Sequence, residues 1–191
     1  MTVSSPLVVS VAMLLAMDVD SARARQPGEL IERTMAIVGG QALTLSEVRA
    51  AVTLGLVSGL DTSADVADAT PRLVDRMLML REVQRYAPPE PPDSDVEREL
   101  TAVRGRFATS DLYTRALQAG GFNESRLRSW IRDDLRVAAY LAQRFAAVTS
   151  TEEASDPTKG RAANERRASL IADWLDDLRR RTTIVELWKT P

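Results

Sequence analysis

Two stretches with β character lie far apart in an otherwise helical sequence, and this placement constrains the fold more than any other feature. Residues 34–38 (TMAIV) and 41–44 (QALT) flank Gly39-Gly40, a pair suited to the positive φ angles of a tight hairpin turn. Residues 182–188 (TTIVELW) have the period of two typical of a strand. A hairpin alone is marginal in water, so we expect this distant segment to join it as a third strand.

The residues between these strands are patterned as helices. Thr44 and Glu47 have the spacing of a capping box, which predicts a helix from Leu45. Pro71 suits a first helical turn, so a second, very apolar helix is expected from there to the proline run at 87–92 (APPEPP).

Three more helices are expected before residue 149. Ser94 and Glu97 form a second capping box for a helix toward Phe107, residues 112–117 form a short helix, and Asn123 is a good N-cap for the longest one. The apolar stripes of all the expected helices define the candidate core: Val48, Ala51, Val52, Leu56, Leu73, Val74, Met77, Leu78, Leu80, Val96, Leu100, Val103, Leu127, Trp130, Ile131, Leu135, Ala138, Leu141, Ala142, Phe145, Leu170, Ile171, Trp174, Leu175 and Leu178.

Composition excludes several classes of function. The chain has neither Cys nor His, which removes thiol nucleophiles, disulfides, imidazole catalysis and nearly all transition-metal sites. A net charge of -2 gives no electrostatic footprint for nucleic acid. Carboxylate pairs such as Glu97/Glu99 or Asp176/Asp177 leave an enzyme open, but neighbouring helical residues point in different directions and nothing else converges on them. We therefore expect no catalytic residues, no cofactor and no metal.

The first residues resemble an export signal. Residues 7–17 (LVVSVAMLLAM) are apolar but too short to span a bilayer, and Ala22 and Ala24 form a small-x-small cleavage site. No Lys or Arg precedes the run, which is atypical, and a buried N-terminal helix is the alternative. The expected organisation is a signal peptide at 1–24, a helical domain at 29–148, a linker at 149–161 and a helix plus strand at 162–189 that pack back on the domain. The expected location is the periplasm, without stable membrane insertion.

Several motifs, taken in order, resemble the SurA-like periplasmic chaperones. The stretch IERTMAIVGGQALTLSEV is similar to the hairpin that opens that family's N-terminal domain. RLVDRMLMLREVQRYA and PDSDVERELTAVRGRF resemble its next two helices, and LYTRALQAGGFNESRLRSWIRDDLRVAAYL resembles the Gly-step and long Arg-rich helix that follow. LIADWLDDLRRRTTIVEL is similar to the closing helix and strand. The resemblance implies a mainly α, multi-helix chaperone domain with a small antiparallel sheet made by the N-terminal hairpin and the C-terminal strand.

One departure from that family concerns catalysis. SurA-like proteins carry parvulin-type prolyl isomerase domains between the long helix and the closing helix, whereas this chain has only the linker there, and no histidine. The resemblance therefore implies an ATP-independent holdase for unfolded clients, chiefly outer-membrane proteins, without isomerase activity. A dedicated cell-envelope assembly subunit with one fixed partner is the alternative, and a prolyl isomerase is less favoured. The sequence does not decide whether the protein acts alone or as a homodimer.

Apolar side chains that can adapt to many partners are the candidates for client binding. For each of them, packing in the core is the competing interpretation. Trp130 and Met77 are expected to lie mostly in the core, whereas Phe107 and Tyr113 are expected to face a client. Arginines of the longest helix could grip client carboxylates or backbone carbonyls, but we expect them rather to pair with Asp133 and Asp134 or to stay solvated. The candidate peptide-binding residues are Phe107, Tyr113, Met77, Met79, Phe122 and Trp130, and the arginines are Arg126, Arg128, Arg132 and Arg136.

Overall fold

The computed structural model describes residues 32–146 and 157–189. The expected signal peptide at 1–24 lies outside the described residues, as does most of the expected linker at 149–161. Within the described part, the structure is mainly helical with one small antiparallel sheet, which is the fold class that the sequence predicts.

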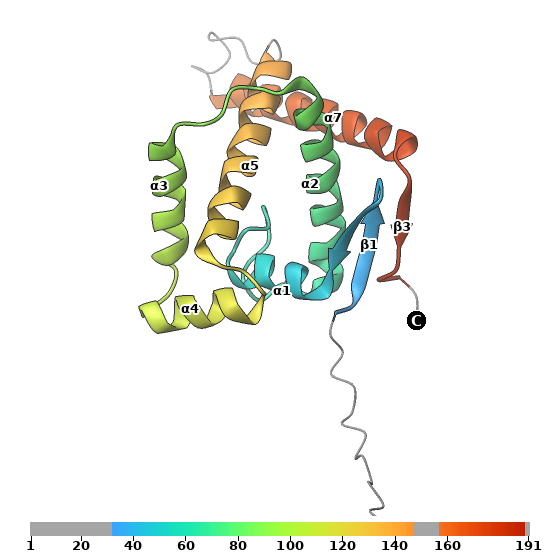
Figure 1. Cartoon of the computed structure of the whole chain (residues 1–191). Coiled ribbons are helices and arrows are strands. Elements are labelled where there is room, and N and C mark those ends of the chain that lie inside the picture. The colour runs from blue at the N-terminus through green and yellow to red at the C-terminus, as the bar shows by residue number, and fades with distance from the viewer. Residues whose placement is uncertain (1–31, 147–156, 190–191) are drawn as a thin grey trace, which may run out of the picture. The chain divides into compact units, whose positions relative to one another are not determined.

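The sheet joins segments from opposite ends of the described chain. β1 (Thr34–Val38) lies in the centre, with β2 (Gln41–Thr44) on one side and β3 (Ile184–Glu186) on the other. Both pairings are antiparallel, and Ile37 faces Ala42 of β2 and Val185 of β3. The predicted third strand is thus confirmed, although it is shorter than the expected 182–188. Figure 1 shows β3 beside β1.

The hairpin turn has the expected conformation. Gly39 and Gly40 have φ angles of 54° and 87°, a left-handed backbone that other residues rarely adopt. Gly39 also lets the Arg81 side chain lie directly on the turn, where Arg81 Nη1 donates to the Gly39 carbonyl oxygen at 3.1 Å. A side chain at position 39 would overlap that guanidinium.

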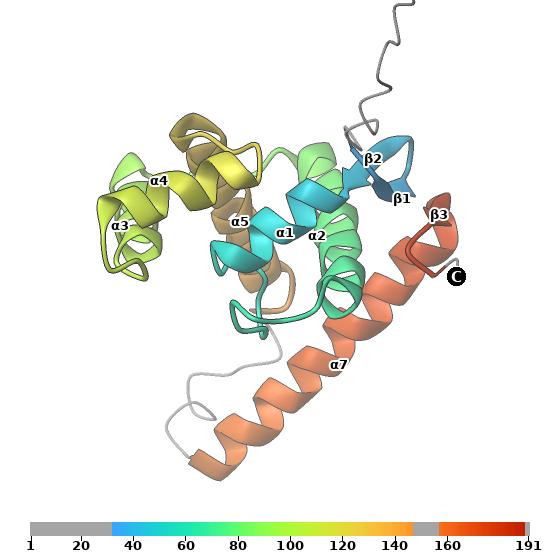
Figure 2. The same ribbon diagram turned by 90° about the horizontal axis from the view of Figure 1, so that it is seen from below.

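Helices α2 and α5 run side by side through the middle of the described residues (Figure 1). α3 and α4 lie beyond them, with α3 against α5 and α4 against α1. α7 crosses α2 and ends beside the sheet (Figure 1 and Figure 2). The helices span Leu45–Thr53 (α1), Val66–Tyr86 (α2), Asp93–Arg104 (α3), Ser110–Ala119 (α4), Glu124–Arg144 (α5) and Pro157–Arg181 (α7).

Two predicted helix starts are confirmed by their caps. The Thr44 hydroxyl accepts from the Glu47 N–H at 3.3 Å before α1, and the Asn123 side chain accepts from the Arg126 N–H at 2.8 Å before α5. Each bond satisfies one of the free donors of a first helical turn. Thr109 caps α4 in the same way, which starts that helix two residues before the expected Leu112.

Two other predicted starts are wrong. α2 begins at Val66, so Pro71 lies inside the helix; the carbonyl that loses its donor belongs to exposed Ala67, where water can replace the lost bond. α3 begins at Asp93 after an extended Pro92, and neither Ser94 nor another side chain caps it. Acidic residues of the first turn favour this start through the helix dipole.

α7 starts within the segment expected to be a linker and docks on the domain by aromatic contacts. Trp174 is 7% exposed, and its ring lies 6.0 Å from Tyr140 and 6.1 Å from Phe145 of the α5 end. Arg179 adds an ion pair at 2.5 Å to Asp75 of α2. Trp174 and Leu178 thereby join the same core as Leu54, Leu78, Leu100 and Leu127, which are almost wholly buried.

Candidate functional site

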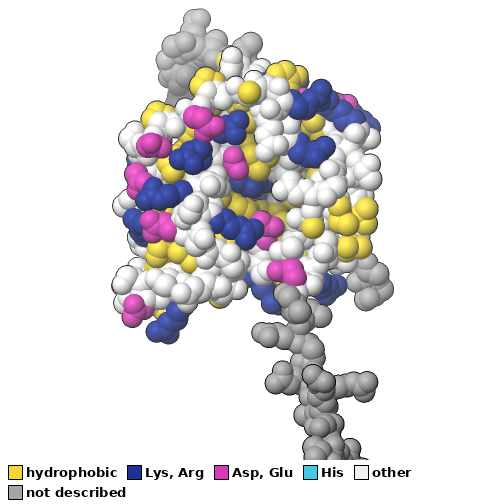
Figure 3. All heavy atoms as spheres, viewed as in Figure 1, with side chains coloured by type: hydrophobic (Ala, Val, Ile, Leu, Met, Phe, Trp, Pro, Cys, Tyr) yellow, Lys and Arg dark blue, Asp and Glu magenta, His cyan; other side chains and the backbone are white. Residues whose placement is uncertain are grey.

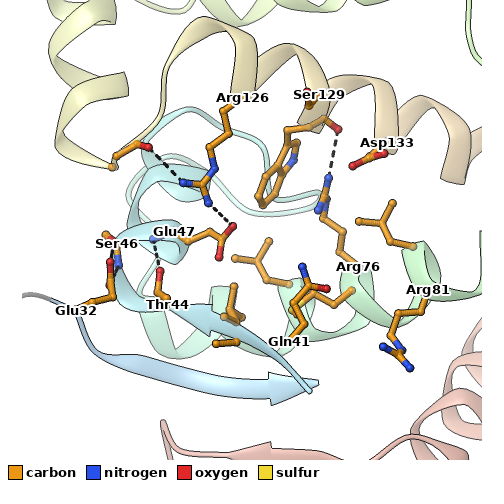
Figure 4. A pocket seen from close by; sticks show the side chains of 18 of the residues that line it. Glu32, Gln41, Thr44, Ser46, Glu47, Arg76, Arg81, Arg126, Ser129 and Asp133 are labelled. Carbon is orange, nitrogen blue, oxygen red and sulfur yellow. Dashed lines mark hydrogen bonds and ion pairs between the residues drawn. The ribbon is translucent and has the colours of Figure 1, made fainter. Parts of the chain in front are cut away.

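An open cavity of about 530 Å³ lies between the hairpin and the long helices, and we call it the β2 cavity. Strand β2 and the start of α1 form one wall, α2 forms the floor, and α5 forms the opposite wall (Figure 4). Its lining residues are Glu32, Gln41, Ala42, Leu43, Thr44, Ser46, Glu47, Leu73, Arg76, Met77, Leu80, Arg81, Gln84, Gly120, Gly121, Arg126, Ser129, Trp130 and Asp133.

The floor of the β2 cavity is apolar because of a helical repeat on α2. Leu73, Met77 and Leu80 recur at the i, i+4, i+7 spacing that places side chains on one helix face. Leu73 is buried, whereas Met77 and Leu80 are only partly covered and remain available to a bound group. Leu43 of β2 and Trp130 of α5 also border the cavity, but both are buried and belong to the core, as expected for Trp130.

Arg76 holds the α5 wall in place. Its guanidinium carbon lies 3.6 Å from the centre of the Trp130 ring, a cation–π contact. Arg76 Nε donates to Asp134 Oδ1 at 2.6 Å and its Nη2 donates to the Trp130 carbonyl oxygen at 3.2 Å (Figure 4). Because one side chain makes all three contacts, the position of α5 relative to the floor is fixed.

Arg126 joins the other end of α5 to α1. Its Nη2 donates to Glu47 Oε1 at 2.8 Å, and its guanidinium lies 4.6 Å from the centre of the Phe122 ring. A weaker bond at 3.3 Å reaches the Gly121 carbonyl oxygen. Arg126 and Glu47 therefore neutralise each other at this end of the cavity.

Two charges at opposite ends of β2 lack an ion-pair partner among the described residues. Arg81 lies at the hairpin turn, and within residues 32–146 and 157–189 its guanidinium hydrogen-bonds to the Gly39 carbonyl oxygen and to no acidic side chain. Glu32 lies near Thr44 and accepts from the Ser46 N–H at 3.2 Å and from the Ser46 hydroxyl. The hydroxyl bond is the largest of the effects that hold the pKa of Glu32 below its ordinary value, so this carboxylate is charged at neutral pH.

The pKa values of two acids on the α5 wall are shifted upward instead, because burial is the dominant effect there. Desolvation raises the pKa values of Asp133 and Asp134, and the positive charge of Arg76 opposes the rise in both. In residues 32–146 and 157–189, no three acidic side chains cluster as a metal site would require. The groups around the β2 cavity are suited to hydrogen bonding and to apolar contact.

The carboxylate pairs considered as acid–base groups do not converge. Glu97 forms an ion pair with Arg128, while Glu99 lies 3.9 Å from the neighbouring Arg98. Asp176 and Asp177 pair with arginines of their own helix, α7. Each of these acids is thus occupied by a local ion pair on the surface.

The structure brings together two of the six candidate peptide-binding residues. Met77 and Trp130 both line the β2 cavity. Phe122 is buried and its ring lies 5.6 Å from that of Trp130, so it supports the wall from behind. Met79 lines a different cavity of about 380 Å³ on the other side of α2, together with Val57, Leu141 and other apolar side chains.

The expectation that Tyr113 and Phe107 face a client fits the structure poorly. Tyr113 is 7% exposed, so this expectation was wrong for Tyr113, while Phe107 is half-buried. Their rings pack edge to face at 5.7 Å, away from the β2 cavity. The reason is that α4 folds back on α1, which covers the helix start where an exposed aromatic residue was expected.

The arginines of α5 mostly pair across to other elements. Arg136 contacts Asp133, as expected, at 3.7 Å, whereas Asp134 pairs with Arg76. Arg136 also lies 3.6 Å from Glu90. The ion-pair partners of the other three candidate arginines are Glu47 for Arg126, Glu97 and Glu124 for Arg128, and Glu90 and Asp93 for Arg132. Figure 3 shows the result on this face, where acidic and basic side chains lie next to each other with hydrophobic atoms between them.

Sequence reasoning did not identify three of the residues that line the β2 cavity. Leu80 was assigned only to the core, Arg76 was not singled out, and Ala42 was treated as an ordinary strand residue. Arg76 lies three residues after Leu73 and four before Leu80, and this spacing could have indicated that the three share one face of α2. Nothing in the sequence alone places Ala42 at the rim of a cavity, because that depends on which side of the hairpin receives the third strand.

Comparisons with known proteins add no family to this geometry, because no protein-family model and no curated protein matches the chain. A survey of the helices in the described residues found none long and apolar enough to cross a membrane.

Proposed function

We propose that this protein is a SurA-like periplasmic chaperone that holds unfolded clients, chiefly outer-membrane proteins, without ATP and without prolyl isomerase activity. The main support is the β2 cavity, an open site with an apolar floor and a polar rim. Such a surface can cover an apolar client segment while the charged rim limits self-association. The chain also contains no Gly-rich phosphate loop of the P-loop type and no histidine.

The floor residue Met77 is the most direct link between the cavity and this function. A methionine side chain is flexible and polarizable, so it adapts to apolar groups of different shape. Met77 is half-buried, which leaves part of it open to a bound segment. Periplasmic location and the identity of the clients rest on the signal-like N-terminus and on the family resemblance.

The test is aggregation of a denatured outer-membrane protein, followed by light scattering with and without the mature protein. We expect the wild-type protein to slow the rise in scattering, and Met77→Ser to weaken this effect by about tenfold in the concentration required. Met79→Ser is the matched control, because Met79 has the same residue type and helix but lines the other cavity. Equal scattering with and without the wild-type protein would refute the proposal.

A dedicated assembly subunit is the second candidate, and the contacts that hold the cavity walls in place favour it. The contacts of Arg76 with Trp130 and of Arg126 with Glu47 give the walls a fixed shape, which suits one partner better than many. Crosslinking in the native cell envelope separates the two functions. One dominant stoichiometric product would favour the subunit, and a broad set of products would favour the holdase. Isomerisation of a proline peptide above the background rate would instead indicate a prolyl isomerase.

A further inference from the structure

Strand β2 is an edge strand whose open side faces the β2 cavity. It pairs with β1 on one side, and no other described strand pairs with it. Figure 4 shows β2, with Gln41 and Thr44, between the rest of the sheet and the cavity. An open edge presents unpaired N–H and C=O groups, which is the template that an added strand uses.

The hydrogen-bond pattern of the sheet identifies which backbone groups are open. On β1, Met35 and Gly39 bond to β3, so the intervening Ala36 and Val38 are the residues that bond to β2. Their partners in the register are Leu43 and Gln41. Ala42 lies between these two, and its N–H and C=O therefore point away from β1, toward the cavity.

The surroundings of Ala42 suit a polypeptide in an extended conformation. Ala42 has a small, exposed side chain, so a neighbouring strand can approach it at the usual spacing of about 4.8 Å. Every second side chain of such a strand would point toward Met77 and Leu80 on the apolar floor. The other side chains would point to solvent.

The two unpaired charges fall at the two ends of this edge. Arg81 lies at the turn end beside Gly39, and Glu32 lies at the other end beside Ser46. Both line the cavity. A bound strand therefore meets a positive charge at one end and a negative charge at the other, which complements a segment carrying an acidic residue at the first end and a basic residue at the second.

We propose that a client segment binds by adding to β2 as a fourth strand, hydrogen-bonded to the Ala42 N–H and C=O, with alternate apolar side chains on the floor and terminal charges facing Arg81 and Glu32. This inference rests on the proposed function and specifies how the β2 cavity recognises its clients. It commits to an extended segment with alternating apolar residues, the pattern of a β-barrel strand.

The test uses a fluorescent eight-residue peptide of alternating Val and Thr, with Asp at one end and Lys at the other, binding to the full mature protein. Two analogues each carry one N-methyl group, on adjacent central residues. In strand addition only alternate N–H groups face β2. We expect one analogue to bind about tenfold more weakly, equivalent to about 1.4 kcal/mol, and the other to bind like the parent. Equal affinity of both analogues and the parent would overturn the proposal.

A variant of the protein tests the same pairing by removing the open N–H of β2. Ala42→Pro removes the open N–H but leaves the bonds of Gln41 and Leu43 to β1, since proline is tolerated where an edge N–H faces outward. Ala42→Val keeps the N–H and is the matched control. We expect about tenfold weaker peptide binding for Ala42→Pro only, with thermal melting near that of the wild type. If the hairpin of this variant melts, the binding of the two N-methyl analogues to the wild-type protein decides whether strand addition occurs.

The outcomes separate this inference from the proposed function. If Met77→Ser weakens peptide binding but Ala42→Pro and both analogues do not, the cavity binds clients and strand addition is wrong. If the parent peptide fails to bind and scattering is unchanged by the protein, both proposals are wrong. If the protein alone is a dimer and Ala42→Pro converts it to a monomer, the edge is occupied by a second copy and the proposal of a client strand is overturned.

Discussion

Replacing Val185 by proline tests the pairing between the two distant parts of the chain. Thr183 and Leu187 bond to β1, so by alternation Val185, which faces Ile37, also bonds to it. Proline removes the Val185 N–H and places its ring where the bond was. Val185 is 43% exposed, so the loss of buried apolar surface is small and the lost backbone bond dominates the effect.

The expected cost follows from that bond. Losing a ladder bond and leaving the carbonyl oxygen of Ile37, a half-buried residue, without its donor costs about 1–3 kcal/mol. In a domain of this size, 1 kcal/mol shifts the Tm by roughly 2–4 °C, so a cost near 2 kcal/mol lowers the Tm by roughly 4–8 °C. Thermal melting followed by circular dichroism measures this shift.

Glu186→Pro is the matched control, because the Glu186 N–H points away from β1. Both variants restrict the unfolded chain to a similar degree, so that effect cancels between them. Glu186→Ala accounts for the surface ion pair with Lys189, which contributes less than about 1 kcal/mol. We expect Glu186→Pro to melt within about 2 °C of Glu186→Ala, judged by the same Tm scale. If the two proline variants melt at the same temperature, the assignment of the β1–β3 bonds is refuted.

Two further changes probe packing and charge. Gly120→Ala should destabilise the protein by about 1–3 kcal/mol in urea unfolding, because the added Cβ would overlap the Ala50 Cβ and lie 2.9 Å from the Ala50 Cα. Gly105→Ala is the control: the nearest atom to its added Cβ lies 3.4 Å away, so this change should cause no measurable loss of stability. Burial raises the pKa of Asp75 and the charge of Arg179 opposes the rise, so an NMR titration should give a midpoint above that of a free Asp side chain, and Arg179→Gln should move it higher. The raised pKa stabilises the fold fully below the unfolded-state pKa, and this contribution is lost as the pH rises through the folded-state pKa.

The sequence allowed the overall fold to be predicted where short-range chemistry decides it. The glycine pair of the hairpin and the caps at Thr44 and Asn123 act within a few residues, so their structural effect is visible in a short stretch. Helix starts at Pro71 and Ser94 were wrong for different reasons. Ala69 and Thr70 before Pro71 are buried, and their packing extends α2 toward the N-terminus, whereas α3 begins only one residue before Ser94, at exposed Asp93, whose charge suits a first helical turn.

The candidate site was less predictable because it depends on contacts between distant elements. Met77 was recognisable as an adaptable apolar residue, but its place beside β2 follows from the packing of the sheet on α2. The stacking of Arg76 on Trp130 joins residues 54 positions apart, and no spacing rule reports such a contact. The burial of Tyr113 is likewise a result of how α4 folds back.

The sheet order has a consequence for how the molecule is made. Val38 pairs with Ile184, which emerges from the ribosome 146 residues later, and closing so large a loop is slow compared with forming the helices in between. During synthesis the edge of β1 that pairs with β3 therefore stays unpaired. We expect the nascent chain to stay protease-sensitive until its last strand arrives, and a shortened product that stops before Ile184 to be cleared by quality control although every helix is present.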